Sequence, residues 1–169
     1  MLRCPSEAGL DYTTVPSPVG PLLLAGDGHG LHLIHFLKGR RPKSPAPDWS
    51  ENDKTFREVM AQLNAYFAGK LRDFALPLVL AGTDFQLRVW RNLQKIPYGE
   101  TTTYGQLARE MGSPEAARAV GLANGANPIP IIIPCHRVIG SNGDLTGFGG
   151  GLPTKKKLLE LESKQKSLF

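Results

Sequence analysis

Apolar and polar positions divide the first half of the chain into strands, a loop and a helix. Apolar runs over residues 11–37 are separated by turns rich in Pro and Gly, which predicts a β region. Residues 39–50 are rich in Pro, Arg and Lys and predict an exposed loop. A helix is predicted over about residues 53–68, and residues 74–80 predict a short strand near a sheet edge. The buried stripe of this helix is predicted at Phe56, Met60, Leu63 and Phe67.

The second half of the chain is predicted to be mainly helical. The capping pattern Thr-x-x-Gln occurs at residues 83–86 and 103–106, and it opens one helix to about residue 95 and another to about residue 111. Gly112 ends the second of these helices, Ser113 is an N-cap, and Pro114 starts a helix that runs to about residue 123. Two short helices joined by a Gly-containing turn predict a helix-turn-helix, although an ordinary helical hairpin is commoner.

Two charged residues stand out against their predicted helices. Arg118 projects from the second helix of the helix-turn-helix, where most other residues are small enough to let that helix approach another surface closely. Glu162 lies on the last helix, which starts near Pro153, at a position that the helical period gives to the apolar face of Leu158 and Leu159. A carboxylate there is either a surface residue of a frayed end or a buried partner for another group.

The segment from Ile131 to Ile133 is a run of β-branched residues, and it predicts a buried extended stretch that turns at Pro134. Cys135 follows directly, so a thiol is held at the end of a rigid segment. An isolated Cys-His pair is more often structural than reactive. Here Arg137 adds positive charge beside the thiol and His136 can accept its proton, which favours a reactive nucleophile.

Charge and cysteine content narrow the class of protein. The chain has 169 residues and a formal net charge of +5, and residues 82–169, with 11 Lys or Arg and 7 Asp or Glu, carry most of the excess. This basic excess suits a partner that bears phosphates, although an ordinary solvated surface would account for the charge alone. Two cysteines form a poor disulfide framework, which predicts a reducing, cytoplasmic setting. The sequence contains no apolar run of membrane-spanning length and no signal-peptide block, so no membrane partner is expected.

The stretch from Asn127 to Val138 contains an Asn-Pro pair and the string P-C-H-R-V, and a Gly-rich segment follows it. It resembles the active-site signature of the O6-alkylguanine-DNA alkyltransferases, in their bacterial form. The resemblance implies an α+β fold. Residues 1–81 would form a small α/β, ribonuclease-H-like domain with an antiparallel β-sheet and a helix. Residues 82–169 would form a mainly helical, winged-helix-like DNA-binding and alkyltransferase domain that contains the helix-turn-helix.

The function that the resemblance implies is DNA repair. Members of the family bind alkylated double-stranded DNA through the minor groove and flip out O6-alkylguanine, with O4-alkylthymine as a further expected substrate. They transfer the alkyl group irreversibly to their own cysteine, in a single turnover. The resemblance implies no cofactor and no metal, and it implies a monomer, with clustering on DNA left open.

The resemblance also assigns roles to residues. Cys135 would be the nucleophile, His136 its base, Glu162 the acid that orients and charges the imidazole, and Asn127 a hinge. Tyr104 would promote nucleotide rotation and donate to the departing base, and Arg118 would replace the extruded base. The expected DNA-binding residues are Arg118, Tyr104, Ser113, Gln86, Ser141 and Ala117. The expected substrate-binding residues are Val138, Gly149 and Phe148, which stands where many members carry Tyr.

Two other classes and one metal site are compatible with parts of the sequence. A cysteine hydrolase could use Cys135 and His136, and a winged-helix regulator would bind DNA without needing the thiol. Some family members hold structural zinc in the N-terminal domain with two cysteines and two histidines. This chain offers His29, His32, His35 and Cys4, but it carries Asp27 where a second cysteine would stand, so no zinc is expected.

Overall fold

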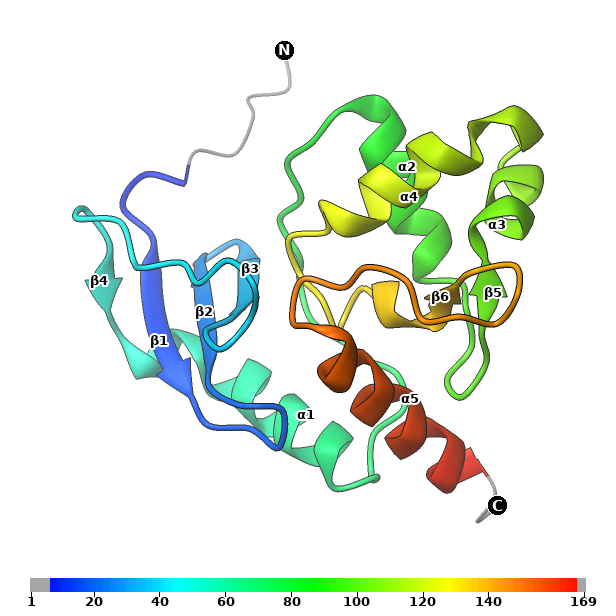
Figure 1. Ribbon diagram of the computed structural model, residues 1–169. Helices are drawn as coiled ribbons and strands as arrows, with labels where there is room; N and C mark the ends of the chain where they lie inside the picture. Colours follow the sequence, from blue (N-terminus) through cyan, green and yellow to red (C-terminus); the bar gives the residue numbers. More distant parts are fainter. Residues whose placement is uncertain (1–6, 167–169) are drawn as a thin grey trace. The chain divides into compact units, whose positions relative to one another are not determined.

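The computed structural model describes residues 7–166, and the chain forms two compact units that divide between Ala81 and Gly82 (Figure 1). The first unit contains a four-stranded sheet and a helix, and the second contains four α-helices and a two-stranded sheet. Within the described residues, no helix has both the length and the apolar character needed to cross a membrane.

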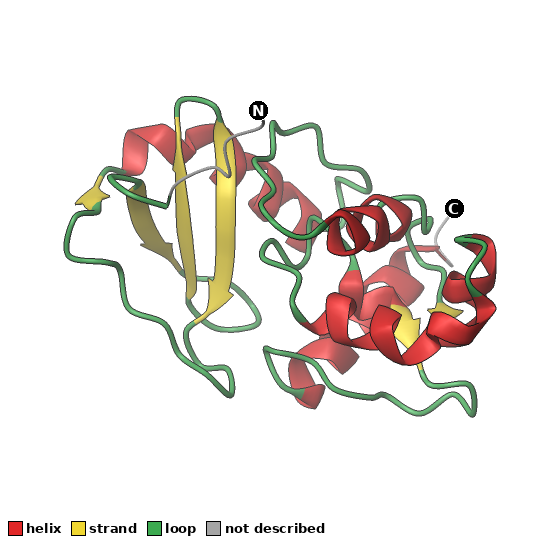
Figure 2. Ribbon diagram, turned by 90° about the horizontal axis from the view of Figure 1, so that it is seen from above, coloured by secondary structure: helices red, strands yellow, loops and turns green. Residues whose placement is uncertain are grey.

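The sheet of the first unit follows the order β3-β2-β1-β4 (Figure 2). Its strands are β1 (Asp11–Val15), β2 (Leu22–Asp27), β3 (Gly30–Phe36) and β4 (Ser50–Glu51). The first three strands pair antiparallel, and β4 pairs parallel to β1. Two sequence predictions need correction. The predicted loop 39–50 ends in the buried Trp49 and the first residue of β4, and residues 74–80 form only a single bridge from Leu78 to Leu31.

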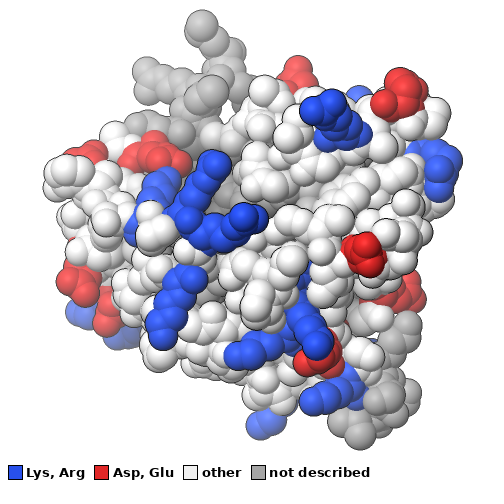
Figure 3. Space-filling model, viewed as in Figure 1, with Lys and Arg blue, Asp and Glu red and all other residues white. Residues whose placement is uncertain are grey.

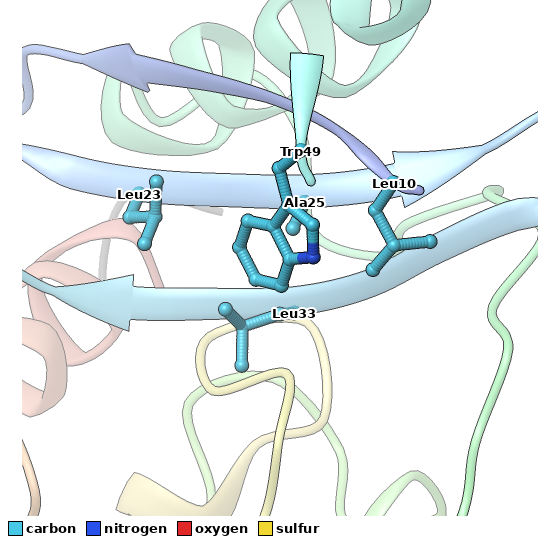
Figure 4. Packing of buried hydrophobic residues seen from close by; sticks show 5 residues of the cluster. All are labelled: Leu10, Leu23, Ala25, Leu33 and Trp49. Atoms are coloured by element: carbon cyan, nitrogen blue, oxygen red, sulfur yellow. The ribbon is translucent and has the colours of Figure 1, made fainter. Parts of the chain in front are cut away.

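Strand β2 is buried on both faces of the sheet, because it lies between β3 and β1 and its first four residues are apolar. Leu23, Ala25 and Leu33 pack with Leu10 and Trp49 on one face (Figure 4). Leu22 points to the opposite face, where it lines a small cavity together with Leu63 of the helix. The indole Nε1 of Trp49 donates to the carbonyl of Glu7, which satisfies the polar atom of a largely buried ring.

The helix of the first unit begins with a 3₁₀ turn, η1 (Asp53–Phe56), and continues as α1 (Arg57–Phe67). The buried stripe that was predicted from the sequence is therefore partly wrong. The residues that are buried are Phe56, Val59, Leu63 and Tyr66, whereas Met60 and Phe67 are only half-buried. These buried residues are spaced three, four and three positions apart, which is ordinary α-helical spacing for one face, shifted from the predicted face by about one residue after Phe56.

The second unit is built from α2 (Asp84–Leu93), α3 (Tyr104–Glu110), α4 (Ala117–Gly125) and α5 (Leu152–Lys166). The first predicted capping box is present in full, because Thr83 and Gln86 each accept a hydrogen bond from the other's backbone N–H. The core of the second unit contains Trp90. Trp90 is almost fully buried, and its Nε1 donates to the carbonyl of Ala123 and so ties α2 to α4.

Helices α3 and α4 form the predicted helix-turn-helix. Gly112 ends α3 with a φ of 78°, which glycine adopts without strain. The chain then forms a 3₁₀ turn, η2 (Pro114–Ala116), so α4 begins three residues later than the sequence indicated. The side chain of Ser113 makes no capping hydrogen bond to this turn, unlike a typical N-cap serine.

Leu23 tests how much the first unit depends on its central strand. It is fully buried on β2, and Leu23→Ala should lower the free energy of unfolding by about 2–5 kcal/mol, through lost apolar burial and the cavity left behind. Leu37→Ala is the matched control, because Leu37 is only partly buried at the margin of the same cluster. Urea denaturation of both variants measures the difference, and equal losses would contradict the assignment of Leu23 to the core.

Candidate active site

The segment that leads to the cysteine is a buried turn and not the extended stretch that its β-branched residues predicted. The side chain of Asn127 organises it: Nδ2 donates to the carbonyl of Ile133 at 2.7 Å, and Oδ1 accepts from the N–H of Ile129 at 3.0 Å. Ile133 N–H in turn donates to the Ile129 carbonyl. Closing this turn forces Ile131 to a φ of 74°, which a β-branched residue rarely adopts. Strain of this kind is typical of functional sites.

Cys135 begins a short 3₁₀ turn, η3 (Cys135–Arg137), that leads into β6 (Val138–Ile139). The sequence predicted that Cys135 stands at the end of a rigid segment, and the structure places it and His136 together on this turn. The thiol is buried, and burial raises its pKa to about 11 even though a hydrogen bond with Asn127 and the charge of Lys155 act to lower it. The resting nucleophile is therefore a neutral thiol.

His136 is fully buried, and its Nε2 lies 2.8 Å from Oε1 of Glu162. Glu162 is ionised and can only accept, so Nε2 carries the hydrogen and Nδ1 carries the lone pair. Within the described residues, Nδ1 is buried and has no hydrogen-bond partner. The histidine is thus fixed in one tautomer, with a proton-accepting nitrogen left available.

The Glu162 carboxylate, which is almost fully buried, is shared between His136 and Arg137. Arg137 binds it through two N–H groups, Nε to Oε2 at 2.9 Å and Nη2 to Oε1 at 2.8 Å. Burial alone would raise the pKa of Glu162, but the hydrogen bonds from His136 and Arg137 outweigh that effect and hold the pKa at about 2. The sequence left Glu162 either as a surface residue of a frayed helix end or as a buried partner for another group, and in the structure it is a buried partner.

This sharing corrects two expectations about charge. The sequence suggested that Glu162 would keep His136 protonated, but burial lowers the pKa of His136 and the nearby charges of Arg137 and Lys155 lower it further, against the effect of Glu162. The imidazole is therefore neutral at rest. Arg137, expected to face the thiol, instead pairs with Glu162 and donates to the carbonyl of Ile96 at 2.7 Å. The ammonium group of Lys155 donates to the carbonyl of Val138, three residues after Cys135, and its charge acts to lower the pKa of the thiol.

The Gly-rich loop, residues 140–151, connects β6 to α5 and passes β5 (Thr102–Thr103) and α3 (Figure 1). Val138 and Phe148 are buried, and Gly149 is exposed. The loop contacts α3 directly, because the hydroxyl of Thr146 donates to the hydroxyl of Tyr104 at 3.0 Å. The structure therefore places the tyrosine against the loop that follows the cysteine segment.

The expected DNA-binding residues lie at several places on the second unit. Arg118 is exposed on α4, and Ala117, at the start of that helix, and Ser113 are half-buried. Ser141 is exposed in the turn after β6, whereas Gln86 is half-buried and its side chain is used in the capping box. In the view of Figure 3, basic side chains form separate groups and not one continuous surface.

Three residues of the second unit were not singled out from the sequence. Leu122 is 73% exposed on α4, four residues after Arg118 and so on the same side of the helix. Asn124 is buried on α4, and its Nδ2 lies 3.4 Å from the carbonyl oxygen of Cys135. Lys155 is fully buried. An exposed leucine on a helix of small residues could have been noticed; the other two depend on packing.

The histidines of the first unit are occupied by other contacts. Asp27 lies 3.1 Å from Nε2 of His32 and 3.6 Å from Nδ1 of His29, and His35 bonds to the carbonyl of Arg41. In the part of the chain that the structure describes, no three metal-ligating side chains converge. Cys4 lies outside that part.

A buried thiol, a histidine with a free ring nitrogen and a carboxylate, carried beside a helix-turn-helix, define a nucleophilic-cysteine protein with a DNA-binding fold. Comparison with known proteins agrees. The family model described as 6-O-methylguanine DNA methyltransferase, DNA binding domain, matches residues 84–164, and the ribonuclease-like domain of the same family matches residues 10–80.

Individual relatives agree across nearly the whole chain. The methylated-DNA–protein-cysteine methyltransferase of Methanosarcina acetivorans is 54% identical over 151 residues, which are 89% of this chain and 97% of the relative. The protein of that name from Mycobacterium bovis is 54% identical over 153 residues, 90% of this chain and 92% of the relative. The crystal structure of Mycobacterium tuberculosis OGT in complex with DNA has 53% identity and a TM-score of 0.86, and covers 92% of this chain and 94% of that one. The chain belongs to the methylated-DNA–protein-cysteine methyltransferase family.

The buried ion pairs of Glu162 predict how the stability of the fold depends on pH. The pKa of Glu162 in the folded protein lies below its ordinary value, so its ion pairs stabilise the fold above about pH 4.5 and are lost as the pH falls toward about 2. Glu162→Gln leaves the buried Arg137 charge unpaired, and should lower the free energy of unfolding at neutral pH by about 3–5 kcal/mol. The variant should also lose less stability than the parent protein on acidification through that range.

Glu160→Gln is the matched control, because it removes an exposed carboxylate from the same helix, which lies 3.9 Å from Nζ of Lys156. Its free energy of unfolding should change by less than about 0.5 kcal/mol. Thermal denaturation between about pH 2 and pH 7 measures both effects. If the two variants behave alike, the carboxylate of Glu162 does not hold this site together.

Proposed function

We propose that this protein repairs DNA by transferring the alkyl group of O6-alkylguanine to its own Cys135. The observation that carries the proposal is the state of His136: Nε2 is locked onto Glu162, and Nδ1 is left buried without a partner among the described residues. A neutral imidazole held in this way can act as a general base, because its Nδ1 can accept a proton. Cys135 directly precedes His136 on the same 3₁₀ turn.

The chemistry begins from the neutral thiol. The thiol proton passes to Nδ1 of His136, directly or through a water molecule, and Glu162 stabilises the imidazolium that results. The thiolate then forms a bond to the alkyl carbon in line, the carbon–O6 bond breaks, and its electron pair leaves with the guanine. The hydroxyl of Tyr104 donates a hydrogen bond to the departing base as negative charge develops on it. A thioether is too stable to hydrolyse, so the protein acts once.

Access to a base inside a duplex requires that the nucleotide be flipped out, at a cost of a few kcal/mol. We infer that α4 enters the minor groove, where its small residues allow close approach and Arg118 fills the space of the extruded base. Arg118 is exposed, as this role requires, and Leu122 lies beside it as an apolar surface for the groove wall. Ser113, Ala117, Ser141 and Gln86 would contact the phosphates and sugars around this helix.

The pocket for the flipped base would lie between the cysteine segment and the Gly-rich loop. The carbonyl groups of Cys135 and Val138 would read the guanine amino group, and the backbone at Gly149 would reach the base oxygen. Phe148 is buried and offers a ring for stacking, without the hydroxyl of a tyrosine. We propose O4-alkylthymine as a second substrate, and a monomer in the cytoplasm as the active form.

Intact mass spectrometry after incubation with a duplex that contains O6-methylguanine tests the proposal. The protein should gain one methyl group, mapped to Cys135, with at most one transfer per molecule. Cys135→Ser should gain none and should still bind the duplex, because the helix-turn-helix is unchanged. Repeated turnover would indicate a cysteine hydrolase, and repair activity in Cys135→Ser, or methylation at Cys4, would exclude Cys135 as the acceptor. DNA binding without any methyl transfer would indicate a regulator.

A substitution of Arg118 tests base flipping separately from alkyl transfer. Arg118→Ala should slow repair of duplex DNA at least about tenfold more than it slows reaction with free O6-benzylguanine, since only the duplex requires an extruded base. Arg91→Ala is the control, because it removes an exposed arginine from α2 and should leave the ratio of the two rates unchanged. Equal losses on both substrates in Arg118→Ala would show that Arg118 serves the fold or the chemistry instead. Duplex binding by the unmodified protein should also weaken as salt rises.

A further inference from the structure

Lys155 is a lysine whose ammonium group is buried inside the second unit. It lies in the first turn of α5, its side chain is fully buried, and Nζ donates to the carbonyl of Val138 at 2.6 Å and to that of Thr146 at 2.9 Å. Among the described residues, no carboxylate lies within ion-pair distance of Nζ. A buried ammonium without a counter-ion is costly and is seldom kept for packing alone.

The surrounding charged groups indicate which anion the Lys155 ammonium group could stabilise. Glu162 is bound by Arg137 and by His136, so its charge is already compensated. His136 is neutral at rest. Burial lowers the pKa of Lys155 and a Cys135 thiolate would raise it, while the ammonium in turn lowers the pKa of the thiol. The Cys135 thiolate is therefore the one anion of the site for which the described residues provide an otherwise unpaired cation.

The two carbonyl contacts give Lys155 a second task. Val138 follows the Cys135 turn directly, and Thr146 belongs to the Gly-rich loop and contacts Tyr104 through its hydroxyl. One ammonium group thus ties the cysteine segment, the loop and, through Thr146, α3. Without this ammonium group, the loop would lose its hydrogen-bonded connection to β6.

We propose that Lys155 is a positioning residue for alkyl transfer: it is the fixed positive charge against which the Cys135 thiolate forms, and it fastens the Gly-rich loop to the strand after the cysteine. This rests on the proposed function in that the thiolate is taken as the nucleophile. Lys155 exchanges no proton in the reaction. The thiol proton goes to His136, and the ammonium stays charged while the anion appears and is then consumed in the new carbon–sulfur bond.

The test is the pH dependence of Cys135 alkylation by iodoacetamide, which needs neither DNA nor alkylguanine. Lys155→Met keeps the length of the side chain and removes its charge, and it should slow the reaction at neutral pH by about 10–100-fold as the thiol titration moves to higher pH. Lys155→Arg keeps the charge and should stay within about threefold of the parent protein. Lys156→Met is the matched control, since Lys156 is an exposed lysine next in sequence, and its titration should not move.

A measurement on the unmodified chain covers the case in which Lys155→Met does not fold. Nuclear magnetic resonance of ¹³C-labelled lysines follows the titration of Lys155 before and after Cys135 is blocked with iodoacetamide. Because the coupling is reciprocal, the blocked protein, which cannot form a thiolate, should titrate Lys155 at lower pH.

Three results would overturn the proposal: coincident thiol titrations in Lys155→Met and the parent protein, an equal shift in Lys155→Arg, or a Lys155 titration that blocking Cys135 does not change. The proposal on Lys155 and the proposed repair function can fail separately. Methyl transfer from duplex DNA with an unshifted thiol titration would remove only the role of Lys155. A shifted titration without methyl transfer would remove only the repair function.

Discussion

The buried carboxylate of Glu162 is the group on which the active site depends. It fixes His136 in the tautomer that leaves Nδ1 free, and it compensates the charge of Arg137, which would otherwise be buried without a partner. Arg137 in turn donates to the carbonyl of Ile96, in the segment that follows α2. Through the contact between Arg137 and Ile96, one carboxylate on the last helix therefore helps to hold the turn that carries Cys135 against a segment 41 residues earlier in the chain.

A second constraint comes from the backbone before the nucleophile. Asn127 closes a turn in which Ile131 has a positive φ, and Asn124, one helical turn earlier, reaches toward the carbonyl of Cys135. Both asparagines belong to α4 or directly follow it. Hydrogen bonds from these two side chains therefore connect the helix that is proposed to enter DNA with the segment that presents the thiol.

Local signals in the sequence predicted much of this arrangement. The Thr83 capping box and the stop at Gly112 fix helix ends through contacts within a few residues, and these are present. Features set by packing were not predictable. Ile131 reads as a strand residue until Asn127 closes the turn, and Lys155 is one of three consecutive lysines that the sequence does not distinguish. The placement of Glu162 on an apolar face indicated a buried partner, but its choice of Arg137 in addition to His136 did not follow from spacing.

The charge state of the site suits a nucleophile that can react only once. Burial keeps Cys135 protonated and His136 neutral, so at rest the thiol is in its less nucleophilic form. Making the thiolate costs free energy in this buried site, and the cost must be met when the substrate is in place. The groups that lower it, the His136 lone pair and the ammonium of Lys155, already lie in the folded protein. In the proposed reaction, little therefore has to be reorganised at the moment of transfer beyond movement of the proton.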